Sequence, residues 1–132
     1  MTSSIGWELY RTFRGGRENG SRAAAARALD RVADAHVLGS IARHAALEPI
    51  RLRAFDRVRE LGAHAEILAV AMNSDFKDTA LAALDLVTQP DALGQVVARG
   101  RNKSAVKRAR AILREAEDRA AREAAEAAAA AV

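Results

Sequence analysis

Apolar residues recur three or four positions apart along most of the chain, which is the spacing of helices that bury one face. Gly, Pro, Asn and Asp separate these runs, and they are the residues that end helices and open turns. The pattern therefore predicts an all-α protein. The predicted helices cover about residues 21–33, 36–45, 49–61, 63–72, 76–87 and 92–99, and a last helix begins near residues 102–104.

A short motif repeats along these helices. Residues 27–32 read Arg-Ala-Leu-Asp-Arg-Val and residues 53–58 read Arg-Ala-Phe-Asp-Arg-Val, with weaker copies at 82–87 and 107–112. One column of the repeat, with steps of 26, 29 and 25 residues, holds Leu29, Phe55, Leu84 and Ala109. Such a period on helical sequence predicts stacked pairs of helices, each an outer helix followed by a shorter inner helix.

The repeat also carries a family resemblance. Residues 20–34, which read Gly-Ser-Arg-Ala-Ala-Ala-Ala-Arg-Ala-Leu-Asp-Arg-Val-Ala-Asp, resemble one unit of the bacterial HEAT-like repeats. The resemblance covers about residues 21–113 and implies an α-solenoid of about three helix pairs. Proteins of this type are scaffolds that bind other proteins, and some bind nucleic acid. The family gives no catalytic residue to carry over to this chain.

Two segments flank the repeats. Residues 1–20 hold a predicted N-terminal helix with Trp7, Tyr10 and Phe13, followed by a Gly-rich linker. The aromatic side chains either cover the open end of the first repeat or dock on a partner or an anionic membrane surface. Residues 114–132 form an Ala-rich helical tail with predicted ion pairs four residues apart. The last helix, about 40 Å long, either folds over the repeats or projects from them and pairs with another helix.

Composition narrows the class of protein. Half of the 132 residues are apolar, and half of these are alanine, which suits thin and closely packed helices. The absence of cysteine excludes a disulfide scaffold, a thiolate nucleophile and Cys-ligated metal sites. The sequence has no leader-like N-terminus and no apolar run of about 20 residues. The expected location is therefore the cytoplasm.

Charge is unevenly spread along the chain. The net charge is +4, but residues 1–114 carry +7 and residues 115–132 carry −3. Residues 99–114 hold seven basic side chains and no acidic one. Because a helix N-terminus also favours anions, this stretch predicts docking of a phosphate or an acidic partner segment, unless it is an ordinary solvated face. The candidate residues are Arg99, Arg101, Lys103, Lys107, Arg110 and Arg114, with Asn102 or Ser104 capping the helix.

Other polar residues favour structural roles. Asp30, Asp56 and Asp85 recur at one repeat position beside arginines, which predicts a ladder of ion pairs along the stack. The three histidines, His36, His44 and His64, lack the spacing of metal ligands and are expected at helix ends or on the surface. The glycines of residues 94–104 lack the Gly-Lys-Ser order of a phosphate-binding loop, and no predicted strand precedes them.

Small residues repeat within the predicted inner helices. Leu38-Gly39 and Leu93-Gly94 match each other, and Leu68-Ala69 takes the same place in the helix between them. We expect these small residues to let neighbouring helices approach closely.

These observations together predict a non-catalytic scaffold that binds another protein. The alternative is nucleic-acid binding through the basic face of the last helix. No nucleophile–base pair, metal-ligand set or cofactor motif is recognisable, so we expect neither an enzyme nor a bound metal or cofactor.

Overall fold

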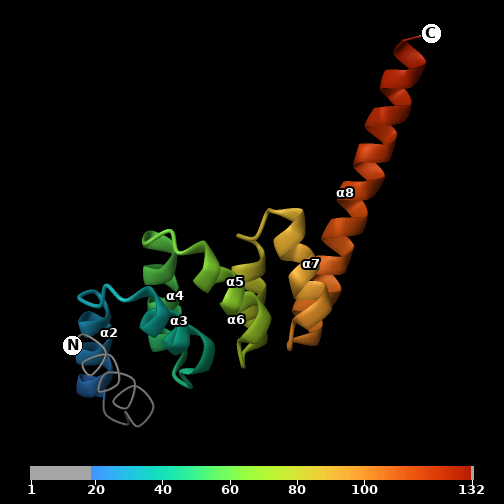
Figure 1. Ribbon diagram of the computed structural model, residues 1–132. Helices are drawn as coiled ribbons and strands as arrows, with labels where there is room; N and C mark the ends of the chain where they lie inside the picture. The colour runs from blue at the N-terminus through green and yellow to red at the C-terminus, as the bar shows by residue number, and fades with distance from the viewer. Residues whose placement is uncertain (1–18, 132) are drawn as a thin grey trace.

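The computed structural model describes residues 19–131, and within this range the chain forms seven helices and no strand (Figure 1). The all-α prediction is confirmed. The predicted N-terminal helix, with Trp7, Tyr10 and Phe13, lies outside the described residues. The helices are α2 (Asn19–Leu29), α3 (Ala35–His44), α4 (Glu48–Glu60), α5 (His64–Asn73), α6 (Lys77–Leu84), α7 (Pro90–Arg99) and α8 (Lys103–Ala130).

The helices pack in two rows that alternate along the chain. One row contains α2, α4, α6 and α8, each in contact with the next, and the other row contains α3, α5 and α7. Figure 1 shows the same progression from α2 at one end of the molecule to α8 at the other. Neighbours in space are therefore also close in sequence.

The closest helix pairs differ from the predicted ones. The sequence pairs the helix at 21–33 with that at 36–45, and so on, whereas the structure packs α3 most extensively against α4, α5 against α6, and α7 against α8. The pairing is offset by one helix, and the connections within the observed pairs are those that follow α3, α5 and α7.

These three connections share one backbone conformation. Ala45, Ser74 and Gly100 each end a helix with φ of −63°, extended ψ, and an N–H donated to the carbonyl four residues earlier. Two of these three-residue turns also bond to the preceding pair, since Asp75 N–H donates to the Arg43 carbonyl at 3.0 Å and Arg101 N–H to the Met72 carbonyl at 2.7 Å. The repeated turn thus links successive helix pairs through the backbone.

The buried side chains follow the same period. Equivalent positions of α3, α5 and α7 are filled by apolar residues, and one position of α4, α6 and α8 is always alanine. Alanine at this position lets the helices approach closely. The sets are Leu38, Ile67 and Leu93; Ile41, Val70 and Val96; and Ala54, Ala83 and Ala109. In this register Ala109 matches Ala83 rather than Leu84, so the last predicted step of 25 residues is one too short.

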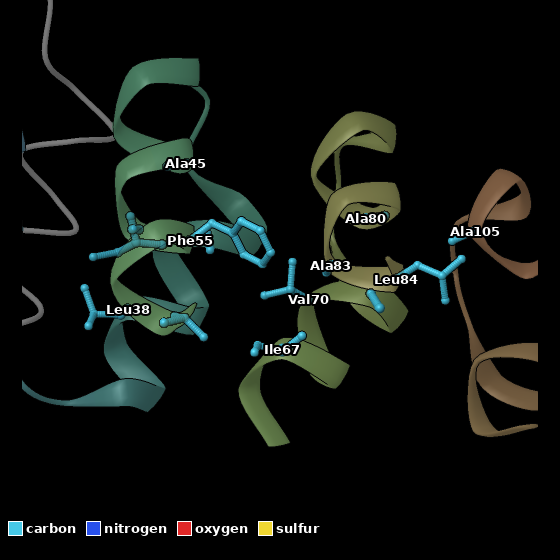
Figure 2. Close-up of a cluster of buried hydrophobic side chains, with 14 of the residues drawn as sticks. Leu38, Ala45, Phe55, Ile67, Val70, Ala80, Ala83, Leu84 and Ala105 are labelled. Atoms are coloured by element: carbon cyan, nitrogen blue, oxygen red, sulfur yellow. The ribbon is translucent and has the colours of Figure 1, made fainter. Parts of the chain in front are cut away.

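Phe55 connects two helix pairs in the core. It is 4% exposed, and Figure 2 shows its ring directed from α4 toward Val70 of α5. Val58 of the same helix is also buried, but Leu52 and Leu61 are 37% and 41% exposed. The apolar residues Leu52, Phe55, Val58 and Leu61 are three positions apart, and each such step turns back by about 60°, so the first and last of them lie on opposite sides of the helix.

Two helices end earlier than the sequence predicts. Residues 30–32 after α2 and residues 86–87 after α6 bond to carbonyls three residues back, which is a tighter turn than the α-helix. The predicted helix end at Gly62 agrees with the structure, because this glycine adopts φ of +63° and closes α4.

Of the three positions at which small residues were expected to let helices approach closely, only Gly39 shows such a contact. Gly39 is buried, and a side chain there would collide with the carboxylate of Glu66. Gly94 has open space around it. Counting from the C-caps, the matching residue of α5 is Leu68 rather than Ala69, so the middle helix carries a large side chain at this position.

The last helix, α8, projects from the rest of the protein. Its 28 residues make it about 42 Å long. Residues 114–131 are all exposed, and Figure 1 shows this half extending beyond the other helices. The ion pairs predicted along it, such as Glu115–Arg119, are not formed within 4.0 Å in this part of the chain. Across residues 19–131, none of the helices combines the length and apolarity that a membrane crossing requires.

Candidate binding surface on the last helix

The six predicted basic residues lie near the start of α8 and are all exposed. Arg99 ends α7, Arg101 lies in the α7–α8 turn, and the other four are on α8 itself. None of the six forms an ion pair with another residue between 19 and 131. We refer to Arg99, Arg101, Lys103, Lys107, Arg110 and Arg114 as the basic surface.

The seventh basic residue of this stretch has a structural role. Arg108 pairs with Asp85 of the α6–α7 connection at 3.1 Å. It stands on a different side of α8 from Lys107 and Arg110, since residues one or two positions apart do not share a helix face. Helical spacing alone separates Arg108 from the four candidates on α8, whereas its ion pair with Asp85 is visible only in the structure.

The start of α8 is capped by its own chain. The Asn102 side-chain oxygen accepts hydrogen bonds from Ser104 N–H at 3.0 Å and Ala105 N–H at 3.1 Å. Arg101 N–H is committed to the Met72 carbonyl. Of the two predicted capping residues, the structure selects Asn102. The backbone donors expected to favour an anion are therefore largely occupied, and the side-chain charges carry the positive field.

The predicted ladder of ion pairs has two complete rungs. Asp30, directly after α2, pairs with Arg53 of α4, and Asp85 pairs with Arg108 of α8. The hydrogen bond to Asp30 raises the pKa of Arg53. Asp56 meets Arg59 of its own helix at 3.8 Å instead. The position of α6 that corresponds to Arg53 holds Ala82, which cannot donate to Asp56.

Arg51 is a buried cation that the sequence analysis did not identify. Its Nε donates to Thr79 Oγ1 at 2.9 Å, and one terminal nitrogen donates to the Ala45 carbonyl at 3.1 Å. The guanidinium also lies 3.7 Å from the centre of the Phe76 ring and 3.5 Å from an oxygen of Asp78. Arg51 therefore joins the α3–α4 turn to the start of α6. A long basic residue on a polar-looking helix gives no sequence signal for this burial.

The three histidines lie on the surface or at helix ends, as predicted. His36 Nδ1 is 3.1 Å from Glu66, and His44 Nδ1 is 2.8 Å from Asp75. His64 begins α5 and is exposed. Within residues 19–131, no three His, Cys, Asp or Glu side chains gather closely enough to hold a metal ion.

Glu66 is held between α3 and α5. One carboxylate oxygen meets His36, and the other is buried without a hydrogen-bond donor among the described residues. Its nearest cation is Arg43, at 3.7 Å, which is too long for a hydrogen bond but close enough for attraction. This arrangement requires Gly39 beneath the carboxylate.

Two adjoining hollows lie between the α4–α5 and α6–α7 connections. Their volumes are about 580 and 410 Å³, and they share His64, Ile67 and Leu86. Leu86, which lines both hollows, is 38% exposed. The rim carries charges of both signs, from Asp56, Arg59 and Glu60. Its chemistry therefore favours no single class of ligand.

Comparison of the chain with protein-family models, with curated proteins and with solved structures found no match. The functional argument therefore stands on the residues and geometry described above.

Proposed function

We propose that this chain is a non-catalytic scaffold of HEAT-like helical repeats, and that it binds an acidic segment of another protein on the basic surface. The repeat interpretation is supported by the recurring turn, the backbone bonds between successive helix pairs, and the periodic buried positions. These features match an α-solenoid, in which each unit contacts its neighbours.

One observation carries the binding proposal. Six exposed cations gather at one end of the molecule without an acidic partner in the described chain. Four of them, Lys103, Lys107, Arg110 and Arg114, fall within an arc of about 60° on α8, away from its buried alanines. Outside α8 and the turn before it, the exposed arginines and lysines without an ion pair among the described residues are Arg27, Arg31 and Lys77. An unneutralised cluster attracts anions and speeds their association.

The length of the basic surface favours a short acidic segment over a long polyanion. From Lys103 to Arg114 the helix advances about 17 Å. Beyond Arg114 the same helix carries Glu115, Glu117 and Asp118, so a nucleic acid that followed α8 would meet repulsion. A peptide with a few carboxylates fits within the basic half alone.

The proposal is tested with a fluorescent poly-glutamate peptide as the probe. Arg101→Glu together with Lys107→Glu should weaken binding at least tenfold in dilute buffer, because both substitutions reverse charge without touching the core. Fluorescence anisotropy measures the affinity. The matched control, Arg31→Glu with Lys77→Glu, changes net charge equally at exposed sites elsewhere on the molecule and should bind nearly as well as the parent. Equal binding by the parent and the variant with Arg101→Glu and Lys107→Glu would contradict the proposal.

Nucleic-acid binding is the second candidate, favoured by the single sign of the exposed cluster. A labelled duplex of mixed sequence distinguishes it from the first. Affinity for the duplex that exceeds affinity for the peptide, and that falls steeply with salt as counterions are released, would favour this alternative. We expect weak duplex binding because of the acidic half of α8.

A further inference from the structure

The two halves of α8 carry opposite charge, and both are open to solvent. The basic surface contributes six positive charges near the start of the helix, without ion-pair partners among the described residues. Residues 115–131 carry five acidic and two basic side chains, a net charge of −3, and make no ion pair within 4.0 Å in the described chain. No other described helix packs on this second half, which is exposed along its whole length.

One line of exposed residues runs the length of α8 at alternating steps of four and three. This is the heptad spacing at which two helices pack along a continuous seam. We call this line the α8 seam. Its first half holds long basic side chains and its second half holds one acidic and three small ones. In order, the seam contains Lys103, Lys107, Arg110, Arg114, Glu117, Ala121, Ala124 and Ala128, all of them exposed.

We propose that the α8 seam binds the α8 seam of a second copy of this chain, with the two helices antiparallel. This inference rests on the proposed function, because it names one acidic occupant of the basic surface. A two-fold axis between residues 114 and 117 makes the same seam serve both copies.

In this register long side chains face small ones, and opposite charges face each other at the centre. The arrangement sets Lys103 opposite Ala128 of the second copy, Lys107 opposite Ala124, and Arg110 opposite Ala121. The aliphatic stems of the basic residues cover alanine, and Asp118 flanks the seam of the second helix near the centre of the pair. At the centre, Arg114 meets Glu117 of the second copy on each side of the axis. A parallel pair would instead oppose Arg114 to Arg114 and basic half to basic half.

The packing of α8 within each copy leaves the α8 seam accessible to a second copy. In the basic half, Ala105 and Ala109 are buried against the other helices and lie on the side of α8 away from the seam. The second copy therefore approaches the solvent side of α8. The bodies of the two copies lie at opposite ends of the helix pair and do not compete for the same space.

The test measures molar mass by light scattering in dilute buffer, on the full chain. The parent should have the mass of two chains at high concentration and shift toward one chain in about 1 M salt, where the Debye length is about 3 Å. Two variants should each be monomeric. One is Lys103→Glu, Lys107→Glu and Arg110→Glu, and the other is Ala121→Lys, Ala124→Lys and Ala128→Lys.

An equimolar mixture of the two variants should recover the dimer. In the mixture the introduced glutamates face the introduced lysines, whereas within each variant like charges gather. The matched control, Ala116→Lys, Ala129→Lys and Ala130→Lys, adds the same charges at exposed positions away from the seam and should stay dimeric. Circular dichroism confirms that helix content is unchanged, since every substituted position is exposed.

Three results would overturn the proposal: a monomeric parent at high concentration in dilute buffer, dimers in both seam variants, or a mixture of variants that stays monomeric. The outcome is separate from that of the proposed function. If the variant with three alanines of the tail changed to lysine is monomeric and still binds the poly-glutamate peptide, the basic surface is a binding surface for other acidic segments as well. If the parent dimerises but binds no peptide, the second copy is the occupant and the foreign partner is excluded.

Discussion

At the scale of single residues, Arg51 ties one helix pair to the next. Its guanidinium is buried between the α3–α4 turn and the first turn of α6, where it satisfies Thr79 Oγ1 and the Ala45 carbonyl. Its ion-pair partner, Asp78, is largely exposed, so the hydrogen bonds matter more than the charge pair.

Replacing Arg51 should therefore weaken the contact between the α3–α4 turn and α6. Arg51→Met keeps most of the volume but donates no hydrogen bond, and buried acceptors would be left without partners. The free energy of unfolding should fall by about 1–3 kcal/mol, measured by urea denaturation. Arg59→Met, at an exposed site of the same helix, should change it by less than about 0.5 kcal/mol. Equal stability of the Arg51 and Arg59 variants would show that the buried hydrogen bonds are unimportant.

Phe55 makes an apolar contact between the same two helix pairs. Phe55→Ala should lower the free energy of unfolding by about 3–5 kcal/mol, because it leaves a cavity between α4 and α5. Leu52→Ala, on the same helix and partly exposed, should cost far less. Thermal unfolding followed by circular dichroism measures both. A Phe55 variant that melts with the parent would show that this side chain is not part of the core.

At the scale of single elements, the sequence is informative about helices and weaker about their ends. Apolar spacing locates all seven described helices, and Gly62 and Asn102 correctly mark an end and a start. The ends of α2 and α6 are missed because residues in a tighter turn keep the apolar spacing of a helix. Apolar spacing depends on which side chains are buried, and hydrogen-bond geometry varies independently of it.

The cap of α8 gives a test at this scale. Asn102→Ala should destabilise the protein by about 0.5–2 kcal/mol, because two N–H groups at the start of α8 lose their acceptor. Ser104→Ala should be nearly neutral, since the serine side chain caps nothing in the described chain. Urea denaturation of the two variants compares them directly. A larger effect at Ser104 would reverse the assignment of the cap.

At the scale of the whole molecule, the period was predictable but the pairing of helices was not. The sequence repeat fixes the distance between equivalent residues, yet a period has no natural beginning. Either neighbour of α3, namely α2 or α4, could complete its pair. The choice follows from backbone conformation at Ala45, Ser74 and Gly100, three residues that share no side-chain chemistry.

Some features of the candidate basic surface could likewise be predicted from the sequence, and others could not. A run of cations was visible in the sequence, and so was the acidic composition that follows it. Their exposure, the removal of Arg108 into an ion pair and the occupation of the helix start by Asn102 required coordinates. Burial of a polar group depends on which helices surround it, and local sequence does not specify those neighbours.

The alternation of the two rows has a consequence for how the chain reaches its native state. Every extensive contact joins helices that are at most three elements apart, so little chain entropy is lost before a contact forms. Low contact order of this kind accompanies folding in microseconds to milliseconds. Order can also spread from one pair to the next through the backbone bonds at Asp75 and Arg101, as in a one-dimensional chain of coupled units. Partial unfolding should therefore begin at an end of the array and leave the remaining pairs intact.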